Sequence, residues 1–116
     1  ISHSEEVVVC AISDKPVGID VEMIRPIGTN ILRKLCTDID LKYILGSDRV
    51  SINIPNNFDD QQLHRFYEVW TAKEAYFKCI GTGIKNLKSI SMDELVGDRK
   101  MYQIENYIIT IVETDN

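Results

Sequence analysis

The longest regular pattern of hydrophobic and polar positions in this chain runs over residues 60–80. Apolar side chains recur there at spacings of three and four residues, which places them on one side of a helix: Leu63, Phe66, Tyr67, Trp70, Phe77 and Ile80. The polar side of the same helix carries Lys73, Glu74 and Lys78. Because Gly81 follows as a stop signal, the pattern predicts one amphipathic helix that ends at Ile80.

Shorter patterns on both sides of this helix predict β-strands. They are β-branched runs or alternations of hydrophobic and polar residues, and they cover residues 6–13, 17–22, 89–92, 100–105 and 107–112. The turn residues Asp14-Lys15-Pro16 favour a hairpin between the first two strands. Asn106 favours a tight turn between the last two.

The stretch between the early strands and the long helix predicts two short helices and a loop. Thr29 or Asn30 could cap the first helix and Asp38 could cap the second, because such residues are common at helix N-caps. The second helix would run to about Leu45. Residues 47–59 contain a proline and two adjacent asparagines, and they predict a loop with one strand-like segment inside it.

The order of these elements is strand-strand, short helices, long helix, strands. This order predicts an α+β fold in which a largely antiparallel sheet packs against the long helix, since alternating βαβ units are missing from the pattern. A length of 116 residues is that of a single domain, residues 1–116.

The charge balance limits the classes of partner. The chain has 13 basic and 18 acidic residues and a net charge of −5 at pH 7, which argues against nucleic acid and anionic membrane surfaces as partners. No apolar run approaches the length of a membrane span. An anionic ligand would therefore need a local cluster of lysines or a bound metal ion.

The cysteines bear on the compartment. Cys10, Cys36 and Cys79 are odd in number and show no CxxC spacing, so neither a disulfide framework nor a zinc site is expected. This pattern favours a reducing, cytoplasmic location. We expect each cysteine to be a small residue of the core.

Two carboxylates lie two residues apart in the segment GIDVE. In a strand, Asp20 and Glu22 would point to the same face, while Ile19 and Val21 would point to the core. One or two carboxylates suffice for Mg²⁺ when substrate phosphates complete its coordination. The plainer alternative is a strand with a solvated acidic face.

A second charged group lies on the long helix. Glu74 and Lys78 are one helical turn apart, and Lys73 adjoins them. They could be a surface ion pair of the usual i,i+4 kind, or a carboxylate and an ammonium that face a phosphate. Gly81-Thr82-Gly83 could bring backbone amides close to an anion, or could simply end the helix.

The N-terminal segment Ser2-His3-Ser4 could present hydroxyl and imidazole donors to a phosphate, although a lone histidine is usually incidental. His64 has no chemical companion in the sequence, and we expect it to be structural. Known motifs of nucleophilic catalysis, P-loops and zinc proteases do not occur.

Three blocks of this sequence, taken in order, resemble the 4'-phosphopantetheinyl transferases. They are ISHS at residues 1–4, PVGIDVE at residues 16–22 and FYEVWTAKEAYFKCIGTGI at residues 66–84. The resemblance is closer to the larger, surfactin-synthetase-activating type than to the small holo-acyl-carrier-protein synthases, which lack the SHS block. The combination of GxDxE with WxxKEAxxKxxGxG is specific, whereas each half alone is weak.

The resemblance implies an activity and a set of site residues. Such enzymes transfer the 4'-phosphopantetheine of coenzyme A to a serine of an acyl or peptidyl carrier protein, need Mg²⁺ and release 3',5'-ADP. Three acidic residues match the metal positions: Asp20, Glu22 and Glu74. Ser2, His3, Lys73 and Lys78 match coenzyme A phosphate positions, with a structural role as the alternative for Lys73. The catalytic residues would be Glu74 and Lys78, with Glu74 or a metal-bound water as the base.

The resemblance also implies an architecture. The larger type has two similar halves with the active site between them, and this chain resembles the C-terminal half. We expect either an N-terminal half before Ile1 or self-association of this short form. The alternatives are a non-catalytic half-domain that binds coenzyme A, Mg²⁺ or a partner, and an α+β domain with no ligand.

Overall fold

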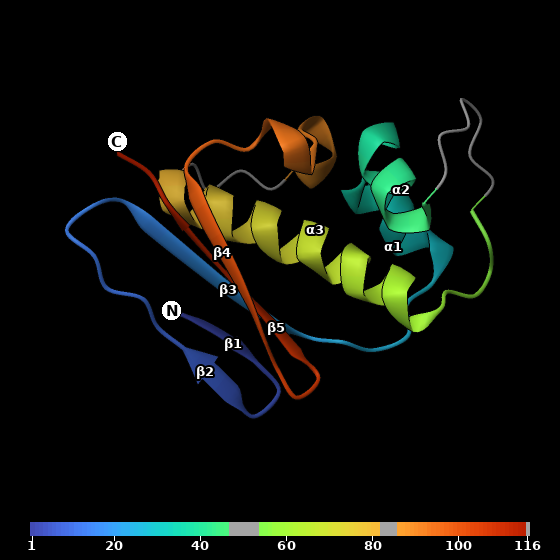
Figure 1. The fold of residues 1–116 in the computed structure, drawn as a ribbon, viewed down its shortest axis with the longest axis horizontal. Helices are drawn as coiled ribbons and strands as arrows, with labels where there is room; N and C mark the ends of the chain where they lie inside the picture. The colour runs from blue at the N-terminus through green and yellow to red at the C-terminus, as the bar shows by residue number, and fades with distance from the viewer. Residues whose placement is uncertain (47–53, 82–85, 116) are drawn as a thin grey trace.

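A long helix crosses one face of a three-stranded antiparallel sheet in the computed structural model, which describes residues 1–46, 54–81 and 86–115 (Figure 1). The helix is α3, Asp60–Ile80, and the sheet has the order β3-β5-β4. Its strands are β3, Val17–Met23, β4, Asp98–Ile104, and β5, Tyr107–Glu113. A second sheet pairs β1, Ser2–Ser4, with β2, Val7–Val9. The α+β prediction is therefore confirmed.

The strand register fixes which residues share a face of the larger sheet. Asp20 pairs with Thr110 and Glu22 pairs with Ile108, and these positions face α3, where Thr71 Oγ1 lies 2.7 Å from Thr110 Oγ1. The intervening residues of β3 and β5 point to the opposite face. There Ile19, Val21 and Ile109 form a small apolar cluster with Val7 and Val9 of β2 and with Ala11.

Two sequence predictions about strands are wrong. The expected hairpin between residues 6–13 and 17–22 does not form, because β2 pairs with β1 and β3 pairs with β5. β3 carries residues that are buried on both faces, and it therefore sits beside the equally buried β5. The strand expected at residues 89–92 is replaced by two 3₁₀ turns, η1, Leu87–Ser89, and η2, Met92–Glu94.

Two short helices lie beside the first half of α3 (Figure 1). They are α1, Thr29–Leu35, and α2, Asp38–Leu45. Their starts differ by a residue from the expectation: Gly28 precedes α1 without a side-chain cap, and Thr37 rather than Asp38 caps α2. Thr37 and Asp40 form a reciprocal capping box that the T-x-x-D spacing could have indicated.

The loop expected at residues 47–59 is tested only in part, because residues 47–53 lie outside the described residues. Residues 54–59 contain no helix or strand and lead into α3. Asp59 caps α3 by accepting from the Gln62 N–H, and the αL conformation of Gly81 ends it, as predicted.

The main core lies between α1, α2, β5 and the first half of α3. Its buried members are Leu32, Cys36, Leu41, Ile44, Phe66, Tyr67, Val69 and Ile108. The second half of α3 buries small residues instead of the large ones expected, since Ala72, Ala75 and Cys79 face the sheet while Ile80 is 40% exposed.

Gly18 explains this choice of small residues. A Cβ on Gly18 would lie 1.9 Å from the Ala75 carbonyl oxygen and 2.5 Å from the Cys79 nitrogen. Only a glycine allows backbones to approach so closely. The contact brings the last turns of α3 directly onto β3, which places Lys78 over Asp20.

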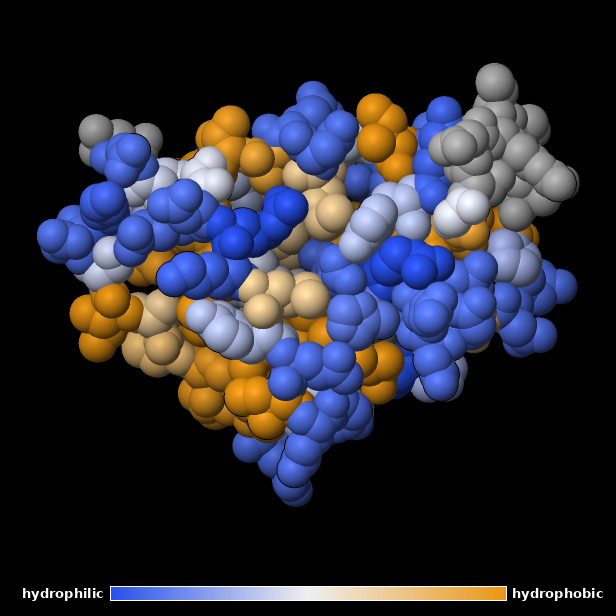
Figure 2. All heavy atoms as spheres, in the orientation of Figure 1, coloured by the Kyte–Doolittle hydropathy of each residue, from blue (hydrophilic) through white to orange (hydrophobic). Residues whose placement is uncertain are grey.

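Hydrophobic side chains also reach the surface. Figure 2 shows them in the lower part of the view, where the β1–β2 hairpin and the β4–β5 turn lie. Val8, Ile12, Tyr102 and Ile104 are among the exposed apolar residues.

Cys10 is exposed as well, which contradicts its expected place in the core, whereas Cys36 and Cys79 are buried. Among the described helices, none is long and apolar enough to span a membrane.

Candidate functional site

Asp20 and Glu22 share the face of β3 that packs against α3, as their spacing predicted. Asp20 is only 3% exposed and Glu22 is half-buried. The alternative of a solvated acidic face is therefore excluded for Asp20, because its carboxylate is buried away from solvent. A buried carboxylate needs partners that offset its lost hydration.

Both hydrogen bonds that Asp20 accepts fall on one oxygen. Oδ1 accepts from Ser2 Oγ at 3.1 Å and from Lys78 Nζ at 2.9 Å. Lys78 also donates to the Ile19 carbonyl at 3.2 Å. Oδ2 is buried and has no hydrogen-bond partner among the described residues. Glu74 and Lys78 are thus not a simple surface pair, since Lys78 forms its ion pair with Asp20.

Negative charge is concentrated around Glu22. Burial, and then the negative charges of Asp20 and Glu74, raise the pKa of Glu22 to about 8. Burial raises the pKa of Asp20 as well, against the lowering effect of Lys78. The two carboxyls adjoin, so a proton or another cation is needed between them for both to be stable. Such a pair is a ready place for a divalent cation.

The residues fit Mg²⁺ through two carboxylates rather than three. Within the described ranges, no group of three His, Cys, Asp or Glu side chains is arranged to hold a metal ion. Glu74 is half-buried and acts on Glu22 through its charge. Asp20 Oδ2, which is buried and has no partner among the described residues, could bind a cation. Mg²⁺ would keep waters and phosphate oxygens in its remaining positions.

The N-terminal strand is attached to β3 by its serine hydroxyls. Ser2 Oγ accepts the N–H of Val21 at 3.2 Å, and Ser4 Oγ accepts the N–H of Met23 at 3.1 Å. These hydroxyls take the place of carbonyls from a neighbouring strand and satisfy the donors at the edge of β3. His3 lies between them and is exposed.

Lys73 does not lie on the polar side of α3, and that expectation is wrong. Its side chain is fully buried, and Nζ donates to Asp40 Oδ2 at 2.6 Å and to the carbonyls of Leu35 and Leu87 at 2.7 Å each. These three bonds use all three donors of an ammonium. Of the two roles implied by the resemblance, the contacts favour the structural one.

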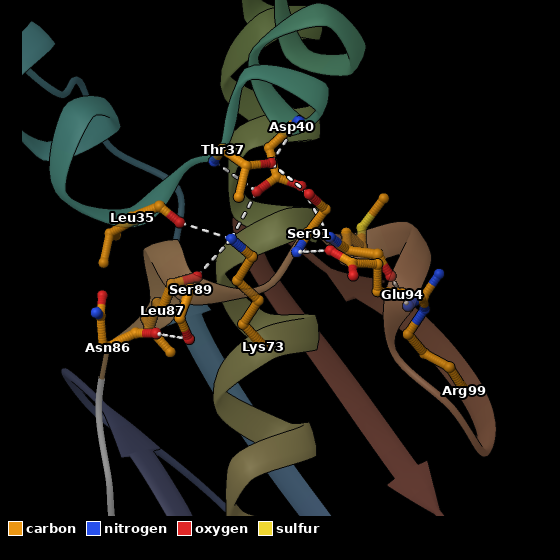
Figure 3. Close-up of polar contacts among 11 residues, drawn as sticks. Leu35, Thr37, Asp40, Lys73, Asn86, Leu87, Ser89, Ser91, Glu94 and Arg99 are labelled. Atoms are coloured by element: carbon orange, nitrogen blue, oxygen red, sulfur yellow. Dashed lines mark hydrogen bonds and ion pairs between the residues drawn. The ribbon is translucent and has the colours of Figure 1, made fainter.

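Figure 3 shows Lys73 at the centre of this network, with Leu35, Asp40 and Leu87 around its nitrogen. Asp40 also accepts from the N–H groups of Thr37 and Met92. The network fastens the α1–α2 junction and both 3₁₀ turns to α3. The sequence did not single out Asp40, and its only signal was the capping-box spacing.

A pocket with a volume of about 480 Å³ opens beside Glu22. Apolar and aromatic side chains line most of it, with Glu22, Glu5 and Arg25 as charged members: the others include Met23, Ile27, Ile31, Tyr67 and Trp70. Sequence reasoning missed the pocket because its walls come from four separate segments. His64, which we expected to be structural, is not among the residues that line this pocket. Its Nδ1 lies 2.8 Å from Glu68 Oε1.

Comparison with known proteins gives this geometry a family. A model of the 4'-phosphopantetheinyl transferase superfamily matches residues 16–111, so the chain belongs to that superfamily. It is 40% identical over 84 residues to the 4'-phosphopantetheinyl transferase gsp of Aneurinibacillus migulanus. The matched residues cover 72% of this chain and 31% of that protein.

Two further relatives agree with this placement. The 4'-phosphopantetheinyl transferase Sfp of Bacillus subtilis is 32% identical over 72% of the chain and 33% of its own length. HetI of a Nostoc species, also a 4'-phosphopantetheinyl transferase, is 33% identical over 79% of the chain and 36% of its own length. The chain thus spans about a third of the length of the relatives it matches.

Proposed function

We propose that this chain supplies the Mg²⁺-binding acidic residues of an enzyme that transfers 4'-phosphopantetheine from coenzyme A to a serine of an acyl or peptidyl carrier protein. The observation that carries the proposal is the buried Asp20, whose Oδ2 has no hydrogen-bond partner among the described residues and which shares a face of β3 with the half-buried Glu22, in a chain of this superfamily. Asp20 and Glu22 would hold the ion, with Glu74 as the third acidic residue near it.

The reaction requires mostly positioning and charge stabilisation. When bound, Mg²⁺ would stabilise negative charge on the pyrophosphate of coenzyme A and on the leaving 3',5'-ADP. The serine oxygen forms a bond to phosphorus, the bond to the 3',5'-ADP oxygen breaks, and Glu74 accepts the serine proton. Lys78, whose side chain is 34% exposed, would stabilise negative charge on the leaving phosphate.

The pocket beside Glu22 fits the rest of the ligand. A ligand whose phosphates lie at Asp20 and Glu22 can place an extended, mostly apolar arm against Tyr67 and Trp70. Pantetheine is such an arm. His3, exposed at the start of the chain, is available to a coenzyme A phosphate.

The carrier protein would dock on the α1–α2 region. Arg33 and Lys34 are exposed in the last turn of α1, and they offer positive charge to a partner that is usually acidic. We predict that the Arg33→Glu/Lys34→Glu double variant raises the KM for the carrier by about tenfold, through lost charge complementarity. An unchanged KM in steady-state transfer assays would remove this surface from the proposal.

The domain would act as one half of a larger site. The chain corresponds to about a third of its relatives, and we propose that residues 1–116 form the C-terminal half of a two-half enzyme. The missing basic contacts to coenzyme A would come from the other half or from a second copy of this chain. Size-exclusion chromatography with light scattering distinguishes a self-associating chain from a monomer.

A mass-spectrometric assay tests the activity. The chain, and any longer protein that contains it, is incubated with coenzyme A, Mg²⁺ and an apo carrier protein. We expect the carrier to gain one phosphopantetheine in the presence of Mg²⁺ and none when EDTA is present. A carrier that gains no mass with the complete protein would contradict the proposal.

A second candidate function is a non-catalytic binding module. It is favoured by the coverage of the relatives, because the chain spans only about a third of their length. This alternative predicts that Glu74→Gln changes the binding of coenzyme A or Mg²⁺ while no transfer occurs with either variant. Transfer by the unaltered protein excludes it.

A further inference from the structure

We propose that Ser2 is a positioning residue for Asp20: its hydroxyl, together with Lys78, occupies one carboxylate oxygen and leaves the other as the metal-binding atom. This inference rests on the proposed function, because it concerns the same acidic site. It assigns to the Ser2 hydroxyl a task other than the phosphate contact that the resemblance implies.

The geometry of the carboxylate carries the argument. Ser2 Oγ lies 3.1 Å from Asp20 Oδ1, and Lys78 Nζ lies 2.9 Å from the same atom. Rotation of the carboxylate about its Cβ–Cγ bond would break both bonds at once. Oδ2 is therefore held in one place, buried and without a partner among the described residues.

Ser2 is itself held firmly enough to do this. It is 6% exposed, and its oxygen accepts the Val21 N–H at 3.2 Å while its proton goes to Asp20. Its strand pairs in register with β2, where Ser2 faces Val9. Groups that orient a metal ligand from behind typically contribute 10- to 100-fold in metal affinity.

The phosphate role is less compatible with these contacts. A hydroxyl has a single proton to donate, and the Ser2 proton is directed at Asp20. A phosphate oxygen is an acceptor and would have to compete for that proton in a site where Ser2 is almost fully buried. His3, the exposed neighbour, is free of this restriction.

Ser4 provides a matched control. Ser4 Oγ accepts the Met23 N–H at 3.1 Å, in the same manner as Ser2 accepts the Val21 N–H, and it lies two residues along the same strand. Ser4→Ala therefore removes the same attachment of β1 to β3 without removing a donor to Asp20. Ser2→Thr keeps the hydroxyl and tests rescue, and Ser2→Cys keeps the size but weakens the donor.

The test is calorimetric titration of Mn²⁺, as a probe for Mg²⁺, into each variant, with thermal melting to confirm that each is folded. We expect Ser2→Ala to weaken Mn²⁺ binding by about tenfold or more, Ser2→Cys by less, and Ser4→Ala and Ser2→Thr by no more than about twofold. Coenzyme A titrated in the presence of EDTA should bind Ser2→Ala as it binds the unaltered chain.

Each other outcome has a definite meaning. Equal losses of Mn²⁺ affinity in Ser2→Ala and Ser4→Ala would overturn the inference, because the effect would then come from β1 attachment. Weakened coenzyme A binding without metal would overturn it in favour of a phosphate contact. If Asp20→Asn itself leaves Mn²⁺ affinity unchanged, the acidic site fails and the proposed function fails with it. If Asp20→Asn abolishes Mn²⁺ binding and Ser2→Ala does not affect it, only the role of Ser2 is wrong.

Discussion

At the scale of single residues, the acidic site lowers the stability of the metal-free protein at high pH. The pKa of Glu22 is about 8 in the folded chain against an ordinary value of 4.5. The folded state therefore binds the Glu22 proton more tightly than the unfolded state does. Stability conferred by this group is fully present below pH 4.5 and is lost as the pH rises through about 8, at up to about 1.4 kcal/mol for each unit of pKa difference.

We predict that Glu22→Gln removes most of this loss. Its free energy of unfolding in urea should fall less between pH 4.5 and pH 8, where the folded and unfolded states differ in the Glu22 proton, than that of the unaltered chain. Saturating Mg²⁺ should produce a similar recovery in the unaltered chain and none in Glu22→Gln. Identical pH profiles for the two proteins would show that Glu22 is not the group responsible.

The buried Lys73–Asp40 pair makes a second prediction at this scale. Removal of one member leaves the other charge buried and unpaired, so Lys73→Met should cost about 3–5 kcal/mol of unfolding free energy. Lys15→Met is the control, because both members of the Lys15–Asp115 pair are exposed, and it should leave the unfolding free energy nearly unchanged. Chemical denaturation measures both. Equal costs would mean that the network in Figure 3 does not stabilise the fold.

Thiol reactivity provides a third test. Burial raises the pKa of Cys36 to about 12, and Cys79 is buried, whereas Cys10 is exposed. The thiolate is the reactive form, so iodoacetamide at pH 8 should alkylate Cys10 first and Cys36 only after denaturation. Mass spectrometry of peptides shows which cysteine reacts. Rapid labelling of Cys36 in the native chain would contradict its burial.

Single residues also show the limits of sequence reading. The two-residue spacing of Asp20 and Glu22 was enough to place both carboxylates on one face, because strand geometry alone decides it. The same reading could not tell that Lys73 is buried. Helix spacing assigns a side, but the burial of Lys73 depends on Asp40 and on two carbonyls from distant segments.

At the scale of elements, the close contact of α3 with β3 determines the site. Gly18→Ala would place a Cβ 1.9 Å from the Ala75 carbonyl oxygen and must push the helix away from the strand. We predict a loss of about 3 kcal/mol or more in unfolding free energy, with weaker Mn²⁺ binding because Lys78 and Asp20 would separate. Gly28→Ala, where nothing lies within 4 Å, should cost about 1 kcal/mol or less. A well-tolerated Gly18→Ala would show that this contact is looser than described.

The elements themselves were predicted to different extents. The long helix and its end at Gly81 followed from apolar spacing and a stop residue, both of which are local signals. Strand pairing did not follow, because a pattern of buried residues says that a strand has two covered faces and not which strand lies beside it. The hairpin expected before β3 was inferred from closeness in sequence alone, and the register shows β5 there instead.

At the scale of the whole molecule, the family membership and the acidic site both support the proposed function. The part of the proposed enzyme that this chain can form is limited by its length. The chain spans about a third of the relatives it matches, and the surfaces around β1–β2 and β4 carry exposed apolar residues such as Val8 and Tyr102. The sequence therefore predicts the acidic residues of the proposed site, whereas the contacts to the rest of a ligand and to a carrier protein are proposals.

The central claim is that Asp20 and Glu22 hold the metal ion on which transfer of phosphopantetheine depends. The most direct measurement is the mass of an apo carrier protein after incubation with coenzyme A, Mg²⁺ and either the unaltered protein or its Asp20→Asn/Glu22→Gln variant, each within any longer protein that contains the chain. The account predicts complete modification by the unaltered protein and a rate at least about 100-fold lower with the folded variant. Modification at equal rates by both proteins would contradict it.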